Sequence, residues 1–168
     1  MILAVDVFYN SDNIAKIVGV LFENWDDPTP KETVIDYLEN IAPYEPGSFY
    51  KRELPCILKL LSRITIEIDC IIIDGYVYLN DDNKKGLGTY LYDNLENKIP
   101  IIGVAKTSFH DNKNNVVEVF RGKSEKPLYI SAIGIDKNQA AQCIKEMHGE
   151  FRFPSLLKQL DQETKKTL

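Results

Sequence analysis

The sequence predicts an α/β protein in which a mixed β-sheet carries helices on both faces. Two β-rich segments near the N-terminus are separated by a short turn signal, as in an antiparallel hairpin. Two later segments, 70–75 and 99–105, are short apolar runs without alternation, which suit strands that are covered on both sides. Amphipathic helical patterns lie between and after these runs, so helices are expected on both faces of the sheet.

The N-terminal part of the chain is expected to form three antiparallel strands. Residues 2–9 and 15–22 are rich in β-formers, and the polar segment 11–13 between them marks a turn. Residues 31–40 fit either a third strand or a short helix. We favour the strand, because the β-branched residues of this segment precede a loop that is itself rich in β-formers.

A helix is expected next, where apolar residues from Leu54 to Ile64 repeat at helical spacing. Proline is compatible with a helix only in its first turn, so Pro55 is expected near the helix start. This assignment places Glu53 at or just inside the start of the helix, beside its apolar stripe.

The rest of the chain alternates strands and helices and ends in two helices. The expected elements are strands at 70–75 and 99–105, a helix at 84–97, a hairpin of 116–121 with 127–132, and helices at 136–150 and from 155 onward. Asp136 is the expected N-cap of the first of these two final helices, and the charged end of the chain is expected to fray. No repeat or long linker divides the chain, so residues 1–168 are expected to form one domain.

Composition excludes several classes of protein. The apolar fraction of 44% and the charged fraction of 27% are ordinary for a globular chain, and the longest apolar run is far too short for a membrane span. Three distant cysteines indicate reduced thiols in a cytoplasmic protein, and two histidines are too few for a zinc site of the His/Cys type. The net charge of −5 argues against a protein that binds nucleic acid through positive charge alone. Carboxylates around a metal site are counted in this sum, however, and a bound divalent cation reverses the local charge.

Two aspartates interrupt strands that are otherwise apolar. Asp6 lies within the first predicted strand, and Asp74 ends the most apolar one. Burying a carboxylate is costly without a partner or a cation, although an aspartate at a strand end can also simply be hydrated. With Glu53, these residues would form an all-oxygen cluster suited to Mg²⁺ or Mn²⁺ and to phosphoryl chemistry. Lys106 follows another inner strand and could either contact a phosphate or lie at the surface.

Other catalytic motifs are absent from the sequence. There is no P-loop motif, and the Gly-Leu-Gly at 86–88 lacks the context of a dinucleotide fold, so no nucleotide cofactor is expected. There is no nucleophile-elbow motif, and histidine is too scarce to support a thiol protease.

Taken together, six segments resemble the endonuclease V family in their order and spacing over nearly the whole chain. They are "DVFY" at 6–9, "PYEPG" at 43–47, "RELP" at 52–55, "IIIDG" at 71–75, "IIGVAK" at 101–106 and "KPLYIS" at 126–131. The resemblance implies a ribonuclease H-like fold and a Mg²⁺-dependent endonuclease that cuts 3′ to a deaminated purine, chiefly inosine, in DNA or RNA. It also implies a role in nucleic acid repair, with inosine-containing DNA or RNA as the partner.

The resemblance also assigns roles to residues of this chain. Asp6, Asp74 and Glu53 would ligate the metal, and Lys106 would contact the phosphate near the cut. The matching wedge consists of Pro43, Tyr44, Pro46 and Gly47, with Glu45 at its variable centre, and Arg52 and Gly75 would also contact the substrate. A proline-stiffened turn with an aromatic ring can fill the gap that a base leaves when it is flipped out of the stack.

Two histidines typical of the family are missing. Asn80 stands at the first position, Gly134 or Ile135 stands at the second, and Asp136 is a candidate oxygen substitute. The alternatives to an active inosine endonuclease are therefore a family member that binds nucleic acid or a partner without efficient cleavage, and a nuclease or phosphatase with another substrate.

Overall fold

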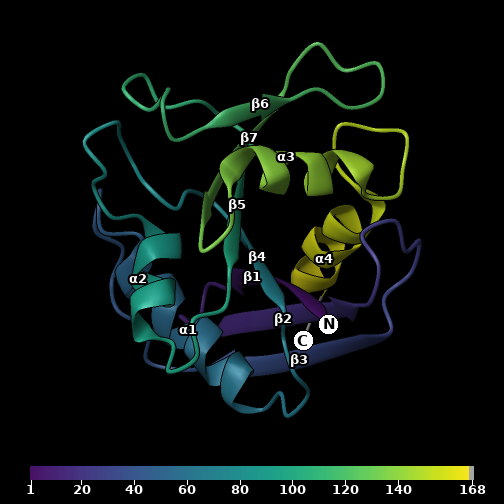
Figure 1. Ribbon diagram of the computed structural model, residues 1–168. Helices are drawn as coiled ribbons and strands as arrows, with labels where there is room; N and C mark the ends of the chain where they lie inside the picture. The colour runs from purple at the N-terminus through teal and green to yellow at the C-terminus, as the bar shows by residue number, and fades with distance from the viewer. Residues whose placement is uncertain (167–168) are drawn as a thin grey trace.

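The computed structural model describes residues 1–166, which are arranged around a seven-stranded mixed sheet (Figure 1). The strands are β1 (Ile2–Tyr9), β2 (Ala15–Phe22), β3 (Glu32–Leu38), β4 (Cys70–Asp74), β5 (Ile101–Ala105), β6 (Val117–Val119) and β7 (Leu128–Ile133). The helices are α1 (Tyr50–Ser62), α2 (Leu87–Asn94), α3 (Lys137–Glu146) and α4 (Ser155–Lys165). The predicted order of strands and helices and the predicted fold class are both confirmed.

The strand order in the sheet is β3-β2-β1-β4-β5-β7-β6. The first three strands form an antiparallel meander, and β1 continues the sheet by pairing in parallel with β4, which in turn pairs in parallel with β5. Antiparallel pairing of β5 with β7 and of β7 with β6 completes the sheet. Strands β4 and β5, which are apolar apart from Asp74 at the end of β4, therefore lie in its interior, as their lack of alternation predicts.

The helices cover both faces of the sheet, as Figure 1 shows. Leu3 and Val5 of β1 point into a core shared with α1 and α2, whereas Ile2 and Ala4 point into a core shared with α3 and α4. This alternation is the two-residue period of a strand that is buried on both sides. No helix within residues 1–166 is long and apolar enough to cross a membrane.

Helix α1 begins earlier than the sequence predicts. It starts at Tyr50, so Pro55 lies inside the helix and not in its first turn. Proline lacks the N–H that would bond the carbonyl of Lys51 four residues earlier. Pro55 and Lys51 are both exposed, so water can satisfy that carbonyl and the helix continues through the proline.

Two other predicted helices are too long. Helix α2 spans only Leu87–Asn94, because Lys85 forms a β-bridge with Tyr78 and the caps Gly86 and Leu95 have extended backbones. Helix α3 has the predicted N-cap, since the Asp136 carboxylate accepts from two backbone N–H groups, but it ends at Glu146. Of the charged chain end that is expected to fray, residues 167 and 168 lie outside the described residues.

Candidate active site

Asp6 and Asp74 lie side by side at one edge of the parallel strand pair. In the register of β1 with β4, Val5 pairs with Ile73, so the next residue on each strand is an aspartate. Strand β4 ends at Asp74, while β1 continues beyond Asp6 along β2. The two carboxylates therefore meet at the carboxyl end of β4, where open α/β sheets place their sites.

Glu53 reaches the same place from the first turn of α1. Its side chain is only 7% exposed, and α1 packs against the sheet through the neighbouring buried residues Cys56 and Ile57. A cavity of about 330 Å³ is lined by Glu53 together with Asp6 and Asp74. The three carboxylates predicted from the sequence thus face one cavity, and we call them the acidic centre.

Burial and mutual repulsion make the acidic centre prone to holding protons. Burial, and then the charge of Asp74, raise the pKa of Asp6 to about 7. Burial, and then the charge of Asp6, raise the pKa of Glu53 to about 8. Asp74 is accessible to solvent through the cavity, but the surrounding protein still raises its pKa, while nearby Lys106 opposes that rise.

The donor set of the acidic centre suits a hard divalent cation. All three side chains offer carboxylate oxygens, and a cation would offset the repulsion that, after burial, raises the pKa values of Asp6 and Glu53. In the present arrangement, no group of three or more His, Cys, Asp or Glu side chains within residues 1–166 could hold a metal ion. The ligands are therefore suitable in kind and share a cavity, but they are more widely spaced than in a closed metal site.

Aromatic and cationic side chains border the acidic centre on the side of α1. The Arg52 guanidinium lies 3.9 Å from the ring centroid of Tyr9 and 5.9 Å from that of Tyr44. The Tyr9 hydroxyl faces Glu53 but is not in hydrogen-bonding geometry with it or with any other residue in the described part of the chain. Arg52 therefore lies close both to the cavity of the acidic centre and to Tyr44 of the wedge.

The wedge (residues 43–47) is exposed along its whole length. Tyr44, which is 61% exposed, also lines the cavity of the acidic centre, whereas Pro43, Pro46 and Gly47 do not. The carboxylate at the wedge centre is paired, because the Glu45 Oε2 atom lies 2.9 Å from the Lys51 Nζ atom on α1. This ion pair accounts for an acidic residue in the middle of the wedge.

Lys106 lies across the acidic centre from the wedge. It follows β5 and lines a larger cavity of about 1090 Å³ that also includes Asp6 and Asp74. Its charge opposes the rise in pKa of both aspartates. The two aspartates therefore stand between two cavities, one beside the wedge and one beside Lys106.

Asp161 of α4 is a site residue that the sequence reasoning missed. It lines the larger cavity, and its charge contributes to the raised pKa of both Asp6 and Asp74. It also forms an ion pair of 2.9 Å with Lys165. The available signal was its position beside the apolar stripe of α4, four residues after Leu157, on a helix that must cover the sheet.

Several other candidate residues are not brought to the cavities. Gly75 has a φ of +126° and its N–H donates to the Val104 carbonyl, but it lines neither cavity. The Asn80 side chain accepts from the N–H groups of Asp82 and Lys84 within its own turn. Asp136 is committed to capping α3 and also lines neither cavity.

Comparisons with known proteins agree on one family. The family described as Endonuclease V matches residues 1–162. A curated Endonuclease V from Clostridium acetobutylicum is 32% identical over 158 residues, which cover 80% of this chain and 66% of the relative. A second, from Trichormus variabilis, is 30% identical over 106 residues and is covered over 47% of its length. The chain thus spans less than two thirds of the length of these two curated relatives.

Solved structures of low sequence identity share the fold. The Bacillus subtilis Endonuclease V superposes with a TM-score of 0.76 at 20% identity, covering 97% of this chain and 77% of that protein. The Ciona intestinalis Endonuclease V, in complex with a 24mer DNA containing an inosine followed by a ribo-adenosine, superposes with a TM-score of 0.75 at 18% identity. It is covered over 83% of its length and this chain over 97%. The sheet and its helices therefore form a ribonuclease H-like fold, and the chain belongs to the Endonuclease V family.

Proposed function

We propose that this protein is a metal-dependent endonuclease that cuts a phosphodiester bond 3′ to inosine in DNA or RNA. The observation that carries the proposal is the shared cavity of Asp6, Glu53 and Asp74. Burial raises the pKa values of all three, and repulsion among these carboxylates adds to the rise for Asp6 and Glu53. Family membership supports the reaction class, and the inosine-containing DNA bound to the Ciona relative supports the substrate class.

The proposed division of roles follows from where the side chains lie. Asp6, Glu53 and Asp74 would hold Mg²⁺ or Mn²⁺, and when bound such a cation would stabilise negative charge on the phosphate and activate a water. Lys106 would orient the scissile phosphate from the larger cavity, as a point charge that does not depend on a fixed geometry.

The wedge would act on the other side of the acidic centre. A base that leaves the stack creates a gap, and the exposed ring of Tyr44 would fill it. Arg52, whose guanidinium lies near the rings of both Tyr9 and Tyr44, would hold the wedge ring close to the carboxylates. On this proposal, residues 1–168 act as a single cytoplasmic domain in nucleic acid repair.

A second candidate is a family member that binds nucleic acid without cutting it efficiently. It is favoured by one observation: His110 and His148 line neither cavity, and the Asn80 and Asp136 side chains are engaged elsewhere. No side chain from the missing histidine positions therefore stands ready to assist a proton transfer at the site.

Parallel cleavage assays separate the two candidates. Matched DNA and RNA strands, with inosine or adenosine at one position, are incubated with the protein and Mg²⁺ or Mn²⁺. An endonuclease of the proposed kind nicks the inosine strands one nucleotide beyond the lesion and leaves the adenosine strands intact. Tight inosine-dependent binding without nicking at high enzyme concentration supports the second candidate, and equal nicking of all strands points to another substrate.

A further inference from the structure

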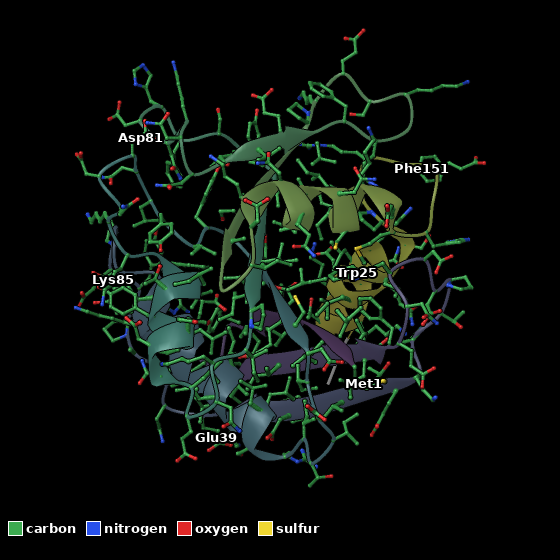
Figure 2. All side chains as sticks on the ribbon, viewed as in Figure 1. Met1, Trp25, Glu39, Asp81, Lys85 and Phe151 are labelled. Carbon is green, nitrogen blue, oxygen red and sulfur yellow. The ribbon has the colours of Figure 1, made fainter. Side chains whose placement is uncertain are left out.

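The larger cavity extends from Asp6 and Asp74 to the loop between α3 and α4. We call residues 148–154 the platform loop, because they present the ring of Phe151 at the edge of the molecule (Figure 2). We propose that this loop binds the strand beyond the scissile phosphate, with an unpaired base stacked on Phe151. The inference rests on the proposed function, since it takes the occupant of the cavity to be the strand that the acidic centre cuts.

Phe151 is unusually accessible for a phenylalanine. Its side chain is 70% exposed, more than that of any other large apolar residue in the described part of the chain. A single exposed apolar ring is not unusual in itself, but Phe151 also lines a cavity that reaches the acidic centre, which makes its ring a candidate contact for a ligand. The flat face of a nucleobase suits such a ring, and stacking of this kind tolerates any base.

The backbone of the platform loop is held in place by a buried arginine. Arg121 is 5% exposed, and its guanidinium donates to the carbonyl oxygens of Phe151 at 2.6 Å, Gly149 at 3.1 Å and Met147 at 2.5 Å. The next residue, Gly122, has a φ of +59° and lies so close to the loop that a Cβ atom would be 2.0 Å from the Glu150 carbonyl oxygen. The ring of Phe151 is thus presented from a fixed backbone, which lowers the entropic cost of binding.

Cations surround the aromatic rings of the platform loop. The Lys158 Nζ atom lies 5.7 Å from the centroid of the Phe151 ring. The Phe153 ring has the Lys106 Nζ atom at 4.8 Å and the Arg152 guanidinium at 5.6 Å. Lysine and arginine beside aromatic rings are the composition with which proteins track a single strand.

Three lysines of the larger cavity are available to a ligand. Lys106, Lys123 and Lys158 form no ion pair with any carboxylate in residues 1–166, whereas the Arg152 guanidinium already donates to the carbonyl oxygens of Lys106 and Pro127. The cavity also contains the carboxylates of Asp6, Asp74, Glu150 and Asp161, so it is not positive as a whole. Its continuity with the acidic centre, together with the lysine ammonium groups beside the rings of Phe151 and Phe153, favours a nucleic acid strand as the occupant.

The positions of the two cavities also indicate which part of the nucleic acid strand the platform loop binds. The wedge lies on one side of the acidic centre and the platform loop on the other, because the two cavities share only residues around Asp6 and Asp74. If the wedge acts at the lesion and the cut is 3′ to it, the platform loop receives the nucleotides that follow the cut.

The test measures binding in the presence of a chelator, so that cleavage does not interfere. Two fluorescent inosine strands are used, identical up to the cut. The short strand ends at the phosphate where the cut falls, and the long strand continues for several nucleotides beyond it. Phe151→Ala is expected to weaken binding of the long strand roughly 5- to 150-fold, the range for loss of one stacked base. The affinity for the short strand is expected to stay unchanged, and Phe151→Trp is expected to retain the wild-type affinity for both.

Phe120→Ala is the matched control, because Phe120 is 52% exposed and does not line the cavity. Equal effects of Phe151→Ala and Phe120→Ala on the long strand overturn the proposal, as does equal weakening of both strands by Phe151→Ala. Concentration-dependent self-association that Phe151→Ala abolishes also overturns it, since a second copy would then cover the ring. If the wild type cuts inosine strands and Phe151→Ala binds the long strand as tightly as the wild type does, the platform is refuted and the nuclease activity stands. If Phe151→Ala weakens binding of the long strand alone but the wild type does not cut, only the nuclease activity is refuted.

Discussion

The ring of Tyr44 is where the wedge meets the acidic centre. It is the one wedge residue that both lines the cavity and stands largely exposed. Its neighbours stiffen the turn: the prolines fix two backbone torsions, and the ion pair of Glu45 with Lys51 ties the loop to α1. Because an exposed ion pair contributes at most about 1 kcal/mol, the prolines are the main source of rigidity.

Tyr44→Ala is expected to reduce cleavage of an inosine duplex more than cleavage of the same inosine single strand. Only in the duplex does a flipped base leave a gap that the ring must fill. Tyr44→Phe is expected to behave like the wild type, since the ring and not the hydroxyl fills the gap. Single-turnover rates on both substrates measure the effect, with Tyr37→Ala as a control at an exposed tyrosine outside both cavities. Equal losses on duplex and single strand contradict the assigned role.

Residues of the acidic centre could be predicted from the sequence where a charged residue interrupts an otherwise apolar strand. Asp6 and Asp74 interrupt apolar strands, so their chemistry was visible without a structure. Asp161 and Arg121 lie in ordinary polar contexts, and only the packing of α4 and the platform loop against the sheet reveals what they do. Tertiary contacts of this kind leave no periodic signal in a sequence.

Among the elements, the platform loop depends on a side chain far from it in sequence. Arg121 precedes the turn between β6 and β7, yet it satisfies the backbone carbonyls of a loop that follows α3. Buried carbonyls need a donor, and a guanidinium can serve several of them at once. One residue thereby fixes the loop that carries Phe151.

Arg121→Met is expected to lower the free energy of unfolding by about 2–4 kcal/mol, because it leaves several backbone carbonyls without donors. Denaturant unfolding measures this change. Arg63→Met is the matched control, because Arg63 is exposed, donates to a single carbonyl and shares its ion-pair partner Asp36 with Lys59. It is expected to change stability by no more than about 0.5 kcal/mol. Equal losses from both substitutions contradict the anchoring role of Arg121.

Helix limits were predicted less well than helix positions. The hydrophobic stripe located α1, but the start at Tyr50 depends on solvent satisfying the Lys51 carbonyl opposite Pro55. The shortened α2 depends on the bridge of Lys85 with Tyr78, a contact between segments that local propensity does not encode. Element type follows from periodicity, whereas the ends follow from tertiary contacts.

For the whole molecule, three buried carboxylates that share one cavity are expected to make the free energy of unfolding depend on pH and on bound metal. The pKa values of Asp6 and Glu53 are about 7 and about 8 in the folded protein, above their ordinary values. Between about pH 4 and 8 the metal-free folded chain therefore binds more protons than the unfolded chain, and its stability falls as the pH rises. A divalent cation that binds the ionised carboxylates offsets this loss.

The melting temperature of metal-free protein is expected to fall between pH 5 and 8, with a loss on the order of 2–4 kcal/mol in the free energy of unfolding. Added Mg²⁺ is expected to restore stability at pH 8 and to have little effect at pH 5, where the carboxyl groups keep their protons. Glu53→Gln is expected to flatten the pH dependence and to raise metal-free stability at pH 8. Glu118→Gln, at an exposed position on β6, is the control, and a pH profile that Glu53→Gln leaves unchanged contradicts the account.

The most direct test of the account is single-turnover nicking of an inosine-containing strand at saturating protein, in Mg²⁺ and in chelator, by the wild type and by Asp74→Asn. The substitution keeps the size of the side chain at the exposed end of β4, so folding and strand binding are expected to be preserved. The account predicts a Mg²⁺-dependent nick 3′ to inosine for the wild type and none for Asp74→Asn. Nicking by Asp74→Asn at the wild-type rate, or no nicking by folded wild-type protein that binds the strand, would contradict it.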